Sequence, residues 1–212
     1  MKYGFASFLL LLSIVGFHCK NRIPFEEIDL SRLKDGDIIF QETNSEQGKA
    51  IKLVTESKYT HVGILFHYGS ELKVLEAVEP VKITKFSNFF KRGSRNHISV
   101  KRLKDNESLL NRTNIDNMKI IGNSFLGKQY DLTFNWSDDK IYCTELVWKV
   151  YKRSLNIEVS KLEKMRDFNL DNPFVKKLIK KRYGNNLPLD EPVLSPSGLF
   201  ESDLFTTVMT VN

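Results

Sequence analysis

The chain has 212 residues, of which 41% are apolar, and its formal net charge is +6. This length suits one domain of ordinary size, and the apolar content is enough to bury a core. The charge permits contact with anionic surfaces but gives no reason to expect a nucleic-acid partner. The sequence also has no phosphate-cradling glycine loop, no metal-ligand cluster and no internal repeat, so we expect no metal and no cofactor.

The N-terminal segment differs from the rest of the chain. Residues 1–18 combine a positive start at Lys2 with an apolar run over residues 5–17. A run this short is typical of a secretory signal peptide rather than a membrane span. Cys19 follows directly, and an apolar run that ends in cysteine resembles a bacterial lipoprotein signal, in which that cysteine is lipidated. A plain cleaved signal and an uncleaved anchor stay open as alternatives, because bulky residues precede the cysteine.

We therefore expect export to the bacterial cell envelope, with the protein either lipid-anchored at a membrane or periplasmic. The expected organisation is a signal peptide over 1–18, a linker over 19–32 and one domain over 33–212. The chain contains two cysteines, Cys19 and Cys143. If the first is lipidated or removed, an exported protein carries a single thiol through an oxidising space. That thiol is either reactive or buried and inert.

The first part of the expected domain combines short strands with helices. Residues 33–41 indicate a turn that opens into a buried strand. Residues 44–57 indicate a helix, because Thr43 and Glu46 have capping-box spacing. The later pattern predicts an irregular stretch with a short helix over 81–94, a strand over 97–103, a helix over 114–126 that ends at Gly127, and a loop or strand over 128–136.

Two predicted strands, 60–66 and 72–78, form a hairpin that decides whether His61 and Glu76 meet. A two-residue turn at Tyr68–Gly69 makes them face each other, and one at Gly69–Ser70 makes them diagonal neighbours on one face. Facing Cβ atoms lie about 4.5–5.5 Å apart and diagonal ones about 7–8 Å, so the carboxylate reaches the imidazole in either register. A three-residue turn would put them on opposite faces.

A lone strand histidine is more often structural, and a lone glutamate is often a solvated charge. Together, His61 and Glu76 match the base and the orienting carboxylate of a catalytic triad. We expect both side chains on the sheet face towards the start of the Cys143 helix.

The stretch 138–151 predicts a buried helix with Cys143 near its N-terminus. Its apolar positions recur with helical spacing, and Asp138 and Asp139 precede it, where a carboxylate can cap free backbone N–H groups. A thiol near a helix N-terminus loses its proton more easily, because the unpaired N–H groups stabilise the thiolate. The alternative is that Cys143 is one more small apolar core residue.

A basic amphipathic helix is predicted over residues 173–184. Phe174, Val175, Leu178 and Ile179 share one side of it, and lysines and an arginine share the other. Such a helix can lie on an anionic membrane or wall polymer. The alternative, which the usual amphipathic pattern favours, is a helix docked on the domain with a solvated cationic face.

A set of short motifs follows in a constant order along the chain. They are Gly-Asp-Ile-Ile-Phe-Gln at 36–41, Tyr-Thr-His-Val-Gly at 59–63, Leu-Glu-Ala at 75–77, Gly-Lys-Gln-Tyr-Asp at 127–131 and Tyr-Cys-Thr-Glu-Leu-Val at 142–147. This set resembles the YaeF/YiiX group of permuted papain-like cysteine hydrolases, in the NlpC/P60 superfamily, over about 33–208. The resemblance implies an α+β fold of permuted papain-like (NlpC/P60) type, in which an antiparallel sheet packs against the nucleophile helix.

The resemblance also implies residue roles. Cys143 becomes the nucleophile, His61 the general base and Glu76 the residue that orients it. Gln41 and the backbone N–H of Cys143 are candidates for oxyanion stabilisation. Tyr130 and Tyr142 are candidates for the cleft lining. For each of the last three side chains, a packing role is the alternative.

The resulting hypothesis is an exported cysteine hydrolase that cleaves peptide-like amide bonds through a thioester, with cell-wall peptides as a candidate substrate. Its expected partner is a peptide-like or acyl small molecule. Two alternatives stay open: a thioester-based acyltransferase or lipid hydrolase, and a non-catalytic envelope binding module.

Overall fold

A computed structural model describes residues 24–211 of the chain. The expected signal peptide and the lipidation expected at Cys19 lie outside the described residues. Two short 3-10 turns, η1 (Phe25–Glu27) and η2 (Leu30–Arg32), begin the described chain. Phe25 packs against Phe86 and Phe90, with ring centroids 5.7 and 5.8 Å apart, so this part of the expected linker lies against the domain.

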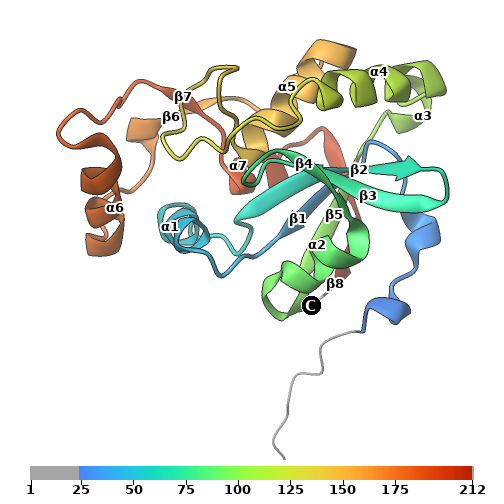
Figure 1. The fold of residues 1–212 in the computed structure, drawn as a ribbon, viewed down its shortest axis with the longest axis horizontal. Coiled ribbons are helices and arrows are strands. Elements are labelled where there is room, and N and C mark those ends of the chain that lie inside the picture. Colours follow the sequence, from blue (N-terminus) through green and yellow to red (C-terminus); the bar gives the residue numbers. More distant parts are fainter. Residues whose placement is uncertain (1–23, 212) are drawn as a thin grey trace, which may run out of the picture.

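One six-stranded sheet organises the molecule (Figure 1). Its strand order is β4-β3-β2-β1-β5-β8, and every neighbouring pair is antiparallel. The strands are β1 (Ile38–Gln41), β2 (His61–Tyr68), β3 (Glu71–Glu76), β4 (Lys82–Lys85), β5 (Ile98–Leu103) and β8 (Phe205–Val211). The predicted strands are present, and β4 is a further strand in a stretch expected to be irregular.

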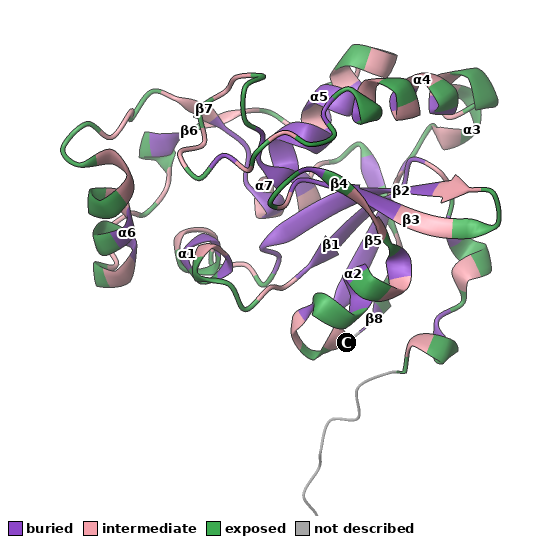
Figure 2. Cartoon of the chain, viewed as in Figure 1, coloured by how far each residue is buried: buried purple, intermediate pink, exposed green. Residues whose placement is uncertain are grey.

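Side chains alternate across this sheet and fill two separate cores. Val62, Ile64 and Phe66 of β2 face helices α4 (Arg112–Asn123) and α5 (Cys143–Leu155). Leu65 of the same strand faces α2 (Phe86–Arg92) and the N-terminal turns. Figure 2 shows the buried residues concentrated in the central strands and in α5. The molecule therefore has the expected α+β architecture, with the sheet packed against the cysteine helix.

The remaining elements lie around this centre. Figure 1 shows α1 and α6 next to each other at one side of the sheet. The elements are α1 (Glu46–Thr55), η3 (Ser94–Asn96), α3 (Asn106–Leu109), β6 (Glu163–Lys164), η4 (Met165–Asp167), α6 (Pro173–Tyr183), β7 (Pro192–Val193) and α7 (Pro196–Phe200). Among the described residues, no helix is both long and apolar enough to cross a membrane.

Two predicted helix ends are wrong in detail. Helix α1 is capped by Ser45, whose hydroxyl accepts a hydrogen bond from the Gly48 N–H at 2.9 Å, and not by a Thr43–Glu46 box. Thr43 instead bonds Thr60 beside β2. Helix α4 ends at Asn123 rather than at Gly127, whose positive φ of 81° belongs to the turn that follows. The stretch expected as loop or strand over 128–136 is loop, apart from a bridge between Tyr130 and Ile141.

Candidate active site

Cys143 is the first residue of α5 and its side chain is buried, with 2% exposure. The predicted apolar stripe of this helix is confirmed, because Leu146, Val147 and Val150 are fully buried with it in one core. Tyr142, at the N-cap, makes no side-chain cap. The backbone N–H groups in the first turn of a helix have no partner within the helix. In α5 these donors are therefore able to stabilise negative charge close to the thiol.

The expected carboxylate caps are wrong. Asp138 lies several residues before the first turn of α5, and its carboxylate pairs with Lys149 at 2.8 Å and Arg153 at 2.7 Å along the side of the helix. The acid at the helix start is instead Glu145, which accepts a hydrogen bond from the Tyr142 N–H at 3.3 Å. Asp138 therefore ties the preceding loop to the body of α5.

The hairpin has one of the two registers that bring His61 and Glu76 together. Ile64 pairs with Leu75 and Tyr68 with Glu71, so the turn is centred on Gly69–Ser70 and the two residues are diagonal neighbours. The imidazole Nε2 lies 2.7 Å from Glu76 Oε2. Both residues are buried, at 6% and 0% exposure.

Gly63 lies between them, at the position that faces Glu76 when this register is continued. A Cβ on Gly63 would lie 2.4 Å from a methyl carbon of Val74 and 3.4 Å from the Cβ of Glu76. Because Gly63 has no side chain, the space between His61 and Glu76 stays open for their diagonal contact.

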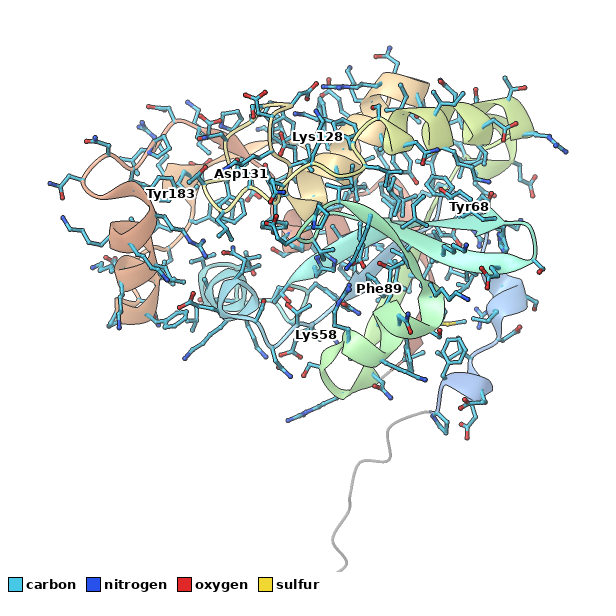
Figure 3. The ribbon with its side chains drawn as sticks, in the orientation of Figure 1. Lys58, Tyr68, Phe89, Lys128, Asp131 and Tyr183 are labelled. Carbon is cyan, nitrogen blue, oxygen red and sulfur yellow. The ribbon has the colours of Figure 1, made fainter. Side chains whose placement is uncertain are left out.

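The expectation about the sheet face is wrong. By alternation His61 and Glu76 share the Leu65 face, which α2 covers, and the His61 ring lies 5.8 Å from the Phe89 ring. Figure 3 shows Phe89 between α2 and the sheet. Cys143 belongs to the opposite core. The two sides meet because His61 is the first residue of β2, where its imidazole comes beside the Cys143 thiol around the strand end, and this contact contributes to raising the pKa of His61. Since Nε2 binds Glu76, Nδ1 is left for the thiol.

Glu76 is held by two further residues that the sequence did not suggest. Thr84 of β4 donates a hydrogen bond to its Oε1 at 2.6 Å. Arg92, at the end of α2, binds both carboxylate oxygens, with Nη1 at 3.0 Å from Oε1 and Nη2 on Oε2. The Arg92 guanidinium also lies 5.3 Å from the Phe89 ring centre. A bidentate pair of this kind fixes the plane of the carboxylate.

These contacts determine the charge states of the pair. Burial alone would raise the pKa of Glu76, but its hydrogen bonds and charge interactions with His61 and Arg92 outweigh burial and lower the pKa to about 2. Burial alone would lower the pKa of His61, but hydrogen bonds to Cys143 and Glu76, together with their charges, raise it to about 9. The imidazole therefore favours its protonated form at neutral pH.

The other three candidates are placed differently. The Tyr130 hydroxyl approaches the Cys143 Sγ at 4.0 Å, and burial raises the pKa of Tyr130 well above its ordinary value, so it stays a proton donor. Tyr142 lines the cleft described below and packs against Phe134, with ring centroids 5.1 Å apart. Gln41 is the register partner of His61, but its amide nitrogen donates to the Phe89 carbonyl at 2.9 Å.

An apolar cleft begins at Cys143 and runs between α1 and α6. Its volume, with the open mouth included, is about 760 Å³. Three α1 residues and three α6 residues form much of its walls: Ala50, Ile51, Val54, Val175, Leu178 and Ile179. The predicted helix over 173–184 is thus docked on the domain by its apolar side. Tyr183, at the end of α6, donates a hydrogen bond to the Thr133 carbonyl at 2.6 Å, near Asp131 in Figure 3.

A thiol on a helix N-terminus, met by an imidazole and its carboxylate on a sheet, is the arrangement of a papain-like cysteine hydrolase. Here the histidine strand precedes the cysteine helix, which is the permuted chain order. Comparison with known proteins agrees. The chain belongs to the family described as permuted papain-like amidase enzymes, YaeF/YiiX, whose family model matches residues 32–209. It is therefore an enzyme of the cysteine amidase type.

Among its relatives is the uncharacterized protein YiiX of Escherichia coli K12, which is 40% identical over 173 residues, or 82% of this chain and 84% of YiiX. A crystal structure of YiiX from Escherichia coli O157:H7 matches with a TM-score of 0.79 and covers 84% of this chain and 97% of that one. That structure is described as one of a metalloprotein. Within residues 24–211 of the present chain, no group of three or more His, Cys, Asp or Glu side chains is suited to hold a metal ion.

Proposed function

We propose that the protein is an exported amidase in which Cys143, His61 and Glu76 cleave an amide bond through a thioester. The observation that carries the proposal is the buried imidazole, which lies 2.7 Å from Glu76 on one side and has the Cys143 thiol beside it on the other. The Cys143 thiolate attacks the carbonyl carbon, and the His61 imidazolium gives its proton to the departing amine. The imidazole then takes a proton from water, which hydrolyses the thioester.

Oxyanion stabilisation in this scheme comes from the backbone. The N–H of Cys143 lies in the uncapped first turn of α5, where donors and the helix dipole both favour negative charge. The Tyr130 hydroxyl is a second donor beside the sulfur. Gln41 is a weaker candidate, because its amide nitrogen is already bonded to the Phe89 carbonyl.

The substrate proposal follows from the cleft. Its walls are mostly apolar, and such walls favour an apolar group over the charged side chains of a wall peptide. We therefore propose amides with an apolar acyl or side-chain group next to the scissile bond. The same observation favours the second candidate, a thioester-based acyltransferase or lipid hydrolase, in which the acyl chain occupies the cleft.

Intact-mass analysis tests the chemistry. The full chain is incubated with N-acyl amides of increasing acyl length and with peptide amides, and the mass of the enzyme and the product are followed. We expect a transient acyl adduct on Cys143 and hydrolysed product, fastest with apolar acyl groups. A long-lived adduct that an added amine or alcohol resolves faster than water would favour acyl transfer. No adduct and no product with any substrate, from folded enzyme, would contradict both.

Export is tested separately, at the N-terminus. The proposal rests on the positive start and the apolar run over residues 5–17, followed by Cys19. Mass analysis of the mature protein should show a chain that begins at Cys19 with added lipid, or an unlipidated chain cut near residue 18. An intact, unmodified Met1 on protein recovered from the cytoplasm would contradict export.

A further inference from the structure

The positive charge of the chain is concentrated on the two helices that wall the cleft. Helices α1 and α6 together carry seven Lys or Arg residues and one acidic residue, Glu46. This excess of six equals the formal net charge of the whole sequence, so the rest of the chain is balanced. The two helices therefore carry a larger excess of positive charge than the remainder of the sequence.

On α6 the lysines lie opposite the cleft-lining side, whereas Arg182 lines the cleft. Val175 and Leu178 are buried against the cleft, whereas Lys177, Lys180 and Lys181 are exposed. Lys176, also exposed, pairs with Asp171 at 2.8 Å. In the part of the chain that the structure describes, Lys177, Lys180 and Lys181 form no ion pair with a carboxylate, so their charge is available to an external anion.

Outside the cleft lining, cations of α1 and α6 lie beside apolar residues. Lys49 of α1 lies 4.4 Å from the ring centre of Phe174 on α6, which joins the two helices at this point. Leu53 of α1 is 36% exposed, and Leu132, next to the residue that Tyr183 bonds, is 46% exposed. Cationic side chains beside partly exposed apolar ones are typical of helices that lie in a membrane interface.

We propose that the outer surface of α1 and α6, away from the cleft lining, docks on an anionic lipid bilayer. A bilayer offers both groups that this surface accommodates: phosphates for Lys49, Lys177, Lys180 and Lys181, and an apolar interface for the partly exposed Leu53 and Leu132. Nucleic acid would satisfy the charge but leave the apolar groups in water. Docking extends the proposed function without depending on it, because it requires no chemistry at Cys143.

Vesicle binding of the full chain tests this. The probe is phosphatidylcholine vesicles with and without phosphatidylglycerol, and binding is measured by co-sedimentation. The variant carries Lys177→Gln, Lys180→Gln and Lys181→Gln. The matched control carries Lys91→Gln, Arg95→Gln and Lys104→Gln, three exposed cations near α2 and β5 whose loss changes the net charge equally. A third variant replaces the three α6 lysines by arginine, which keeps the charge. Circular dichroism verifies folding of each.

We expect wild-type protein to prefer the phosphatidylglycerol vesicles and to dissociate as salt rises. The α6 glutamine variant should bind about 100-fold more weakly, since each lysine near an anionic surface contributes to partition. The control and arginine variants should bind as wild type. Equal loss in the α6 and control variants, equal binding to both kinds of vesicle, or binding to DNA with none to vesicles would each overturn the proposal.

Discussion

The two sides of Cys143 are built in contrasting ways. On one side lies a relay of hydrogen-bonded polar groups, namely His61, Glu76, Thr84 and Arg92, carried by neighbouring strands and α2. On the other side lies the cleft, whose walls come from α1 and α6 and are mostly apolar. The relay uses directional bonds and admits one arrangement, whereas apolar packing tolerates changes of shape. In the proposed mechanism the sheet therefore positions the reacting groups, and the two helices determine which substrate fits.

The largest effect should come from removing the reacting pair. Cys143→Ala and His61→Ala should each abolish nearly all turnover, a loss of up to about 10⁶-fold, and the double variant should lose little more, because the two residues act as a unit. Kinetics on an amide substrate measure this, and iodoacetamide labelling at mildly acid pH measures the thiol. Full turnover in Cys143→Ala, or labelling that is unchanged in His61→Ala, would return Cys143 to a packing role.

Glu76→Gln should cost less, at most about 10⁴-fold in kcat, because the amide disturbs the tautomer and charge of the ring but leaves the pair in place. It also removes an interaction that raises the pKa of His61. Since the imidazolium is needed as the acid, activity should fall as pH rises through about 9 in the wild type. In Glu76→Gln this alkaline limit should lie lower. An unchanged limit would show that Glu76 does not control the ring.

A change in the cleft should affect substrate binding and leave the relay intact. Val54 lines the cleft. Val54→Trp should raise KM for long apolar acyl amides by about 10- to 100-fold, because the larger side chain fills the space that one or two carbon groups of the acyl chain would occupy. The neighbouring Leu53 is exposed and not part of the lining, so Leu53→Trp is the matched control. Iodoacetamide labelling of Cys143 should be equal in both. Similar kinetic constants in the two variants would place the substrate elsewhere.

Arg92→Gln should have the smallest effect, about a 10-fold loss of kcat or less, since Thr84 and His61 still hold Glu76. Its pH dependence is more informative. In Arg92→Gln the Glu76 carboxylate is no longer paired with a guanidinium, so it stabilises the His61 imidazolium more strongly. The upper pH limit of activity should therefore rise, whereas in Glu76→Gln it should fall. Arg92→Lys should restore the wild-type limit in part. A downward shift in Arg92→Gln would assign Arg92 a purely structural role.

The sequence indicates more of the hydrogen-bonded relay than of the cleft. A hairpin of two short strands leaves few registers, and two of the three simple turns around Gly69 bring His61 and Glu76 together, so the sequence predicts their partnership conditionally. The sequence did not indicate on which sheet face His61 and Glu76 lie, because that depends on where the start of α5 lies relative to the first residue of β2. Arg92 lies in a stretch with no strong pattern, and only the fold places it on Glu76. The cleft joins residues 47–55 to 165–196, and no local pattern indicates that these segments meet.

The permuted chain order has a consequence for how the enzyme is made. During synthesis the strand that carries the imidazole emerges first, and Cys143 emerges after it, followed by β8, which pairs with β5 at the edge of the sheet. The incomplete nascent chain therefore contains His61 before it contains Cys143. A thiol outside this site has no imidazole partner and reacts slowly. The proposed pair forms only when α5 docks on the sheet, so Cys143 acquires its imidazole partner only on folding.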